Sequence, residues 1–263
     1  VGYSANALGG AGGPLAVLII AIVAAELGKA VSKETKVDIL VTPLVTIFAG
    51  VGLSMLIAAP IGAAASQVGT LIMWATEQAP LVMGILVSVI VGVALTLPIS
   101  SAAICAALGL TGLAGGAAVA GCCAQMVGFA VMSYKENGVG GLVSQGLGTS
   151  MLQMGNIIKN PRIWIAPTLA SAITGPLATC LFHFEMNGAA VSSGMGTCGL
   201  VGQIGVYTGW VSDIAAGTKA AITPMDWAAM VLLCFVLPAV LSVVFCEVER
   251  KLGWIKEGDL KLN

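Results

Sequence analysis

Residues 113–133 have the sequence LAGGAAVAGCCAQMVGFAVMS, and this stretch contains no charged side chain. A helix that crosses the hydrocarbon core of a bilayer needs about 20 predominantly apolar residues. Glycine and alanine allow membrane helices to pack closely, because lipid provides no hydrophobic drive between helices. The stretch therefore predicts a transmembrane helix that packs on its neighbours through small residues.

The whole chain has the composition of an integral membrane protein. Of its 263 residues, 58% are hydrophobic and only 9% are charged, whereas soluble domains carry about 25% charged residues. No Asp, Glu, Lys or Arg lies between Asp38 and Glu77, nor between Glu77 and Lys135. Long continuous apolar runs favour helices over short alternating strands. We therefore expect an all-α, polytopic transmembrane protein with broken or re-entrant helices.

The apolar runs predict six crossing helices separated by shorter broken segments. Pro60 and Pro98 are expected to end or kink the helices that contain them, because proline removes a backbone donor. Ser100 or Ser101 is suited to cap a half-helix after Pro98. Broken segments at membrane depth are the best sequence indicator of a transport site. The expected spans are residues 14–28, 39–59, 80–98, 113–133, 163–182 and 227–246, and the expected broken segments are 61–76, 100–110, 140–158 and 187–210.

The pattern predicts a single transmembrane domain over residues 1–263. The chain begins with Val1 rather than Met, so further helices upstream are compatible with the sequence. Within the domain, residues 187–210 form a candidate re-entrant hairpin and residues 247–263 form a polar tail.

The distribution of basic residues predicts the orientation of the chain in the membrane. Lysine and arginine cluster in residues 28–36, at Lys159 and Arg162, and in the C-terminal tail, and cytoplasmic loops carry such an excess. Residues 213–226 contain one Lys and two Asp and fit the opposite side. We therefore expect a cytoplasmic C-terminus and an outward crossing by residues 163–182.

Glycines are concentrated in the stretch SSGMGTCGLVGQIG, residues 192–205. Its G-x-G-x-x-G match would indicate dinucleotide binding only inside a βαβ unit, which the surrounding sequence does not predict. The spacing of three favours a tight hairpin with exposed backbone groups, and the alternative is a helix that packs a small-residue face on a neighbour. The glycines expected to form the hairpin backbone are Gly194, Gly196, Gly199 and Gly202.

The motif HFEMN, residues 183–187, precedes this hairpin and contains the single histidine of the chain. In a helix, His183 and Asn187 would share a face, whereas Glu185 would point elsewhere unless the helix breaks near Gly188. A charged group at membrane depth is costly and usually lines a pathway, and the alternative is a carboxylate at the membrane interface. We predict that Glu185, Asn187 and His183 bind a solute, although His183 alone is better explained by packing.

A second group of uncharged polar side chains lies in residues 144–156. Amides and hydroxyls satisfy the hydroxyls of a neutral polyol without net charge, and the alternative is an amphipathic segment at the membrane interface. Gln153 and Asn156 are further candidate solute ligands for this reason. Gln203, in an apolar run, is another, unless its amide bonds to a neighbouring helix.

Other kinds of chemistry find little support in the sequence. The seven cysteines lie in apolar segments without a CxxC pair and are expected to be small buried side chains. With one histidine and no set of nucleophile, base and orienting group, we expect no catalytic residue, no metal site and no cofactor. There is no P-loop. A net charge of −1 gives no basic surface for nucleic acid.

The stretches GNIIKNPRIWIAPTLASAITGPLAT and GMGTCGLVGQIG resemble the membrane (IIC) component of bacterial phosphotransferase-system (PTS) sugar transporters. The signature is Asn160-Pro161 followed by Trp164-Ile165, a proline and LASAITGP. The chain is most similar to a divergent branch of stand-alone IIC-like proteins, some of which are described as regulators of toxin expression. The better-known branches carry a Glu-Pro-Ile type signature, whereas Met186-Asn187-Gly188 follows Glu185 in this sequence.

The resemblance implies a homodimeric permease of the bacterial inner (plasma) membrane that moves a transport domain against a scaffold, as an elevator. It implies a re-entrant hairpin with an acidic residue that contacts sugar, and Glu185 is the residue at that position. It also implies a separate IIB protein that phosphorylates the sugar at the cytoplasmic opening, so the chain itself is not expected to be an enzyme.

We therefore expect the chain to transport a sugar or a similar small polar solute across the bilayer. One alternative is a membrane sensor or regulator that binds a solute and signals without transporting it. Another is a proton-coupled carrier of a non-sugar metabolite, with Glu185 as the protonatable group.

Overall fold

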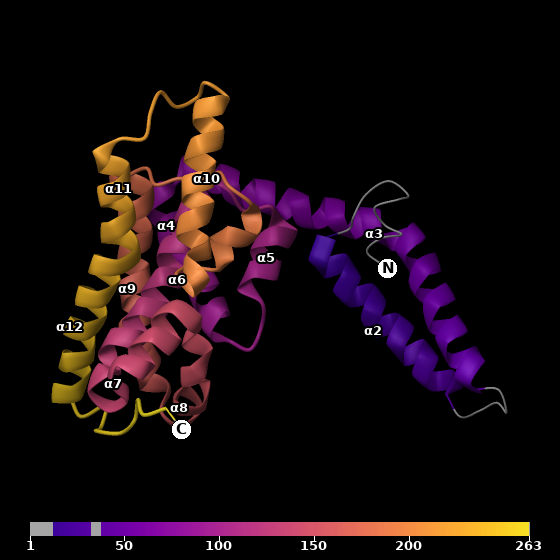
Figure 1. Ribbon diagram of the computed structural model, residues 1–263, viewed down its shortest axis with the longest axis horizontal. Helices are drawn as coiled ribbons and strands as arrows, with labels where there is room; N and C mark the ends of the chain where they lie inside the picture. Colours follow the sequence, from indigo (N-terminus) through magenta and orange to yellow (C-terminus); the bar gives the residue numbers. More distant parts are fainter. Residues whose placement is uncertain (1–12, 33–37, 263) are drawn as a thin grey trace. The chain divides into compact units, whose positions relative to one another are not determined.

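The computed structural model describes residues 13–32 and 38–262 (Figure 1). These residues form helices, and the only pairing of extended backbone in this part of the chain is an isolated bridge between Gly112 and Met186. The predicted all-α class is thereby confirmed. Residues 33–37, which include the second half of the expected basic cluster 28–36, lie outside the described part. The helical segments long and apolar enough to cross a membrane are Asp38–Gln78, Gly112–Met132, Pro161–Leu181 and Pro224–Lys251.

Contacts divide the chain into two compact units, which are described separately. The first comprises Val1–Thr70 and Ala106–Leu108. Its described helices are α2 (Gly13–Val31) and the greater part of α3 (Asp38–Gln78). They pack through small and β-branched side chains, and most of their other apolar residues are exposed, as expected of helices surrounded by lipid.

Helix α3 continues through Pro60, where the sequence predicts the end of a span. The helix has 41 residues, and the predicted broken segment 61–76 is part of it. The predicted end of the span and the predicted broken segment were wrong here, and the alternative expected for Pro60, a helix that continues through the proline, is the one observed. Proline removes one helical hydrogen bond, but ending the helix among apolar residues would leave several backbone groups unsatisfied, so continuing it costs less.

The second unit comprises Leu71–Cys105 and Gly109–Asn263 and is a bundle around helix α6 (Gly112–Met132). Helix α6 is almost wholly buried and packs against three further helices, α4 (Pro80–Thr96), α9 (Ile165–Pro176) and α12 (Leu237–Lys251). The other α-helices are α5 (Ser101–Leu108), which the two units share, α7 (Tyr134–Val143), α8 (Met154–Lys159), α10 (Val201–Ala215) and α11 (Pro224–Val231). Short π and 3-10 turns are η1 (Ser144–Gly148), η2 (Ser150–Gln153), η3 (Pro161–Trp164), η4 (Leu177–Leu181), η5 (Ala190–Gly194), η6 (Cys198–Leu200) and η7 (Leu232–Val236).

Glycines allow α4, α6 and α9 to approach one another closely. A Cβ atom added at Gly121 of α6 would overlap the carbonyl oxygen of Ser88 in α4. A Cβ atom at Gly175 of α9 would overlap the carbonyl oxygen of Gly84, also in α4. The prediction that residues 113–133 pack through small residues is therefore confirmed.

Two of the predicted interruptions occur in the second unit. Helix α4 ends at Thr96, before Pro98, and the Ser100 hydroxyl accepts a hydrogen bond of 3.1 Å from the backbone N–H of Ala103 at the start of α5. The expected cap is thus present. Residues 144–153 form the π turn η1 and the 3-10 turn η2 instead of a regular helix.

The second unit has two polar ends. The loop between α10 and α11 lies at one end of the bundle, and the C-terminal residues lie at the opposite end, beside α7 and α8 (Figure 1). The α10–α11 loop and the C-terminal residues are therefore separated by the length of the bundle.

Candidate functional site

The chain changes from helix to extended backbone at the end of η4, the last turn that continues α9. His183 has a φ of 42°, a left-handed conformation that is uncommon outside glycine and ends a helix. The backbone N–H of Phe184 then donates to the carbonyl oxygen of Ala178 at 2.8 Å, closing the helix end. Residues 184–189 continue as non-helical backbone up to η5.

This extended segment is fixed to the first turn of α6. Met186 and Gly112 exchange both backbone hydrogen bonds, at 2.9 and 3.0 Å. A Cβ atom at Gly116 would overlap the carbonyl oxygen of Phe184, so the absence of a side chain there allows the contact. Phe184 and Met186 are buried, while His183 and Glu185 are exposed, which is the alternation expected of a strand.

The extended backbone corrects the helical geometry considered for the motif HFEMN. A helix would have separated Glu185 from His183 and Asn187. In extended backbone, residues two apart lie on the same side, and all three line one cavity. The predicted span ended at residue 182, one residue beyond η4, but the left-handed conformation of His183 was not predicted, because histidine gives no strong signal for a helix end.

The cavity has a volume of about 500 Å³ and lies at the end of the bundle that carries the α10–α11 loop. Asn187 lies between two carboxylates in it. Its Nδ2 atom donates to Oε2 of Glu185 at 3.0 Å and to Oδ2 of Asp213, near the end of α10, at 2.8 Å. One amide therefore holds two acidic side chains that would otherwise repel each other.

An ion pair and an aromatic ring form another wall of the cavity. The Lys219 Nζ atom lies 2.8 Å from Oδ1 of Asp226 and 5.5 Å from the centre of a ring of Trp210. Trp210 is buried and meets Trp227 edge-on at 5.7 Å between ring centres. With three carboxylates and one ammonium, the cavity is acidic, and it combines hydrogen-bond acceptors with an aromatic surface.

Beyond the extended segment, the chain turns back through η5 and η6 into α10. Gly196, Gly199 and Leu200 have φ values of 52°, 53° and 58° around this turn. A Cβ atom at Gly196 would overlap Cys122, which follows Gly112 along α6 by about 15 Å at 1.5 Å per residue. The turn therefore reaches the middle of α6, whereas the cavity lies at its beginning.

The predicted hairpin glycines lie at close backbone contacts or at the left-handed turn. A side chain at Gly194 would meet the backbone of Ser101, and one at Gly202 would meet the carbonyl oxygen of Gly196. Gly199 requires its positive φ rather than space. Gly202 lies within α10, so the second half of the stretch is a helix that also packs through a small residue.

The structure does not bring Gln153, Asn156 or Gln203 into the cavity. Gln153 and Asn156 lie at the opposite end of the unit, where their amides donate to the backbone carbonyl oxygens of Leu260 and Lys261 at 3.0 and 2.9 Å. The Gln203 amide donates to the Cys123 sulfur at 3.2 Å, and its carbonyl oxygen has no partner within the described residues.

Sequence reasoning missed Asp213, Lys219, Asp226 and Trp210 as cavity residues. These residues lie in or near the α10–α11 loop, for which the charges predicted only a side of the membrane. One signal was available: Asp213 and Asp226 are the only acidic residues between Glu185 and Glu247.

Most of the cysteines are buried, as predicted. Cys105, Cys122, Cys123, Cys234 and Cys246 are buried free thiols. The prediction was wrong for Cys180, which is exposed on η4, and Cys198 at the hairpin turn is half-buried.

The apolar bundle and its broken helices define an all-α polytopic membrane protein. The family model described as "Phosphotransferase system, EIIC" matches residues 3–262. The chain therefore belongs to the EIIC family, the sugar-transporting membrane permeases of the phosphotransferase system, which are transporter components rather than enzymes. No curated protein and no solved structure matches the chain.

Proposed function

We propose that this permease binds a sugar or a similar small polar solute in the acidic cavity at Glu185, Asn187 and Asp213. The observation that carries the proposal is the single amide that holds two carboxylates beside the buried ring of Trp210. Solute hydroxyls would donate to the carboxylate oxygens, and the apolar face of a sugar would lie against the ring. His183, exposed at the same cavity, would contact the solute from the rim.

In this proposal, residues 187–210 form a re-entrant hairpin that moves together with the solute. The approach of its turn to the middle of α6 supports this role, because irregular backbone at membrane depth is tolerated where it lines a protein site. The division of the chain into two compact units supports an elevator-type movement of a transport part against a scaffold.

The proposed partners are a second copy of the chain and a IIB protein. The end of the second unit that carries the C-terminus would face the cytoplasm of a bacterium, because exposed lysines and arginines gather there. A IIB protein would phosphorylate the solute at this end, and the permease itself would contribute no catalytic residue.

Uptake by the purified chain in proteoliposomes tests the proposal. Radiolabelled hexoses, hexitols and disaccharides are supplied with and without a phosphorylated IIB protein. We expect saturable uptake of at least one of them, reduced at least about ten-fold by Glu185→Gln, because a carboxylate–hydroxyl bond is worth about 1.5–3 kcal/mol. Glu257→Gln, which alters an exposed carboxylate in the tail, is the matched control and should leave uptake unchanged. Solute binding without uptake would indicate a sensor and contradict the transport proposal.

The pair of carboxylates supports a second candidate function, a proton-coupled carrier of a non-sugar metabolite. Glu185 and Asp213 lie side by side in the cavity, each accepting a hydrogen bond from the Asn187 amide, and acidic side chains at membrane depth are typical of proton relays. Uptake driven by an imposed proton gradient, in the absence of a IIB protein, would favour this candidate over phosphorylation-coupled sugar transport.

A further inference from the structure

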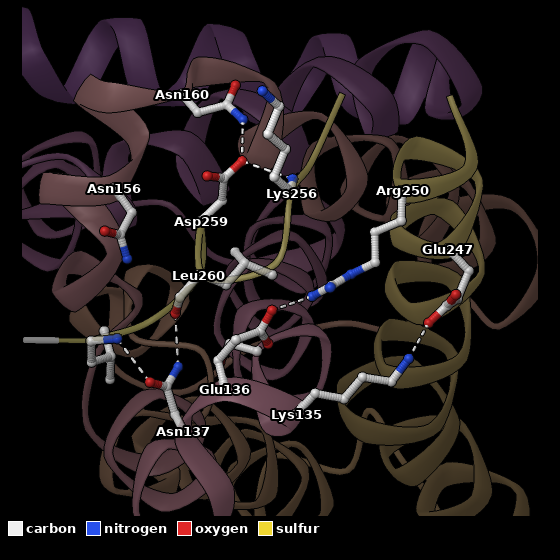
Figure 2. A network of polar contacts seen from close by, with 12 residues as sticks. Lys135, Glu136, Asn137, Asn156, Asn160, Glu247, Arg250, Lys256, Asp259 and Leu260 are labelled. Atoms are coloured by element: carbon white, nitrogen blue, oxygen red, sulfur yellow. Dashed lines mark hydrogen bonds and ion pairs between the residues drawn. The ribbon is translucent and has the colours of Figure 1, made fainter. Parts of the chain in front are cut away.

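The C-terminal segment after α12 is held by side-chain amides that contact its backbone (Figure 2). Asn137 donates to the carbonyl oxygen of Leu260 at 2.8 Å and accepts from the backbone N–H of Leu262 at 2.8 Å. Gln153 donates to the same Leu260 carbonyl at 3.0 Å, and the Leu260 side chain is fully buried. The segment is therefore docked in a fixed register.

Two buried glutamines connect the docked segment to η1. The Gln153 amide also donates to the side-chain oxygen of Gln145 at 2.9 Å, and the Gln145 amide donates to the hydroxyl of Ser133 at 2.8 Å. All three side chains are fully buried. A buried polar network whose donors are satisfied is rigid, because breaking any bond leaves an unpaired group in an apolar environment.

The residue that follows Gln145 contacts the turn of the hairpin. The hydroxyl of Thr197, at the turn, donates to the carbonyl oxygen of Gly146. Helix α10 begins just beyond the turn and carries Asp213 to the cavity, about 18 Å from Val201 at 1.5 Å per residue. Because a helix moves as a rigid rod, a displacement of the turn would also displace Asp213 relative to Asn187.

From this continuous path of contacts, we infer that Gln145 and Gln153 are positioning residues of the transport site: they fix the hairpin turn by connecting it to the docked C-terminal segment. The inference rests on the proposed function, in which the hairpin and α10 carry part of the solute site. The two glutamines do not touch the solute and act through Gly146 and Thr197.

Alkylation of a native thiol measures this positioning directly. Cys198 lies next to Thr197 at the turn and is half-buried, while Cys180 on η4 is exposed and serves as an internal reference. The unmodified full-length permease and its variants are treated with N-ethylmaleimide, and the rate at each thiol is followed by mass spectrometry. We expect Gln145→Met and Gln153→Met each to raise the Cys198 rate about five-fold and to leave the Cys180 rate unchanged.

Gln125→Met is the matched control. Gln125 is also a fully buried glutamine, bonded to Thr96, Thr168 and Trp164, and none of these three hydrogen bonds reaches the hairpin turn or the C-terminal segment. It should lower thermal stability by a similar amount without changing the Cys198 rate. An equal rise in this control, or an unchanged Cys198 rate in both network variants, would overturn the inference.

A double-mutant cycle distinguishes a positioning role of the two glutamines from a general loss of stability. Thr197→Val removes the hydroxyl of the turn with little change in shape and should raise the Cys198 rate by itself. Adding Gln153→Met to Thr197→Val should produce no further rise in the Cys198 rate, because Thr197→Val already removes the hydrogen bond between the turn and Gly146. Additive effects would contradict the inference. If the glutamine variants do not fold, Asn156→Ala, which removes a half-buried donor to Gln153, replaces them in the same cycle.

The labelling does not depend on transport, so the two proposals can fail separately. If Glu185→Gln leaves solute uptake unchanged while the Cys198 rates behave as expected, the solute site is elsewhere and the positioning role stands. If uptake depends on Glu185 but the Cys198 rates do not respond, the positioning role fails and the proposed function stands.

Discussion

The Asn187 amide lies between the carboxylates of Glu185 and Asp213 and donates one hydrogen bond to each of them. The sequence predicted Glu185 and Asn187 as solute ligands and left open whether a helix continues through them or breaks near Gly188. It did not predict Asp213, because that contact joins residues 26 positions apart and depends on how α10 packs. The residue types of the site could therefore be predicted from the sequence, whereas the positions of their side chains relative to one another depend on how the helices pack.

Asn187→Leu should weaken solute binding at least about ten-fold. The change removes the shared donor and leaves two carboxylates facing each other, and hydrogen bonds to charged groups contribute about 1.5–3 kcal/mol. Equilibrium binding of the transported solute to the detergent-solubilised permease measures the effect. Thr218→Val, at the same cavity, is the control, because its hydroxyl contacts only the Asp213 backbone. Equal affinities for both variants would contradict this role of Asn187.

The left-handed conformation of His183 predicts which substitutions the position tolerates. Asparagine adopts positive φ readily, whereas a β-branched residue does so at a cost of about 1–2 kcal/mol. We expect His183→Val to lower the melting temperature in detergent by several degrees more than His183→Asn does. If the two variants melt together, the helix end does not depend on this conformation.

At the scale of elements, small residues predicted how the helices pack, whereas prolines did not reliably predict where the helices end. The small residues of 113–133 predicted a closely packed central helix, and α6 has that packing. Pro60 was expected to end or kink its helix, and the helix does not end there, because the apolar surroundings favour its continuation. Pro98 predicted a break that is present, because a serine after it caps the next helix. A proline alone therefore does not decide between these outcomes.

Gly121→Ala should destabilise the second unit. The added methyl group would overlap the Ser88 carbonyl where α6 crosses α4, and overpacking of this kind typically costs about 1–3 kcal/mol. Gly155→Ala is the matched control, since Gly155 lies in α8 with no atom near the added methyl group. It should be neutral or slightly stabilising. Thermal unfolding in detergent compares the two, and similar losses would show that the helix crossing tolerates a side chain.

At the scale of the whole molecule, composition was sufficient to predict a helical membrane protein. The motifs around Asn160 and the hairpin glycines predicted the family, which the match over residues 3–262 confirms. The docking of the C-terminal segment was not predictable. Gln153 and Asn156 have the same amide chemistry whether they meet a polyol or a peptide carbonyl, so only the fold distinguishes the two.

The proposed orientation predicts opposite accessibility for the two polar ends of the second unit. In intact cells, a membrane-impermeant maleimide should label Thr218→Cys, in the α10–α11 loop, above the level of the parent protein. Lys256→Cys, in the C-terminal segment, should be labelled only after the membrane is permeabilised. Both residues are exposed, so burial does not explain a difference. The reverse pattern would place the C-terminus outside the cell.

The amides that hold the C-terminal segment bind mainly its backbone carbonyl and N–H groups, which every amino acid except proline supplies in full. Selection on this segment should therefore act on its length, on its two buried anchors, Ile255 and Leu260, and on Asp259, whose carboxylate accepts hydrogen bonds from the Asn160 amide and the Lys256 backbone N–H. Among related permeases, we expect the other positions of the tail to vary freely while the spacing of these anchors from α12 is preserved. An insertion of one residue before Leu260 should be more harmful than several substitutions, because it shifts the carbonyls of Leu260 and Lys261 away from their amides.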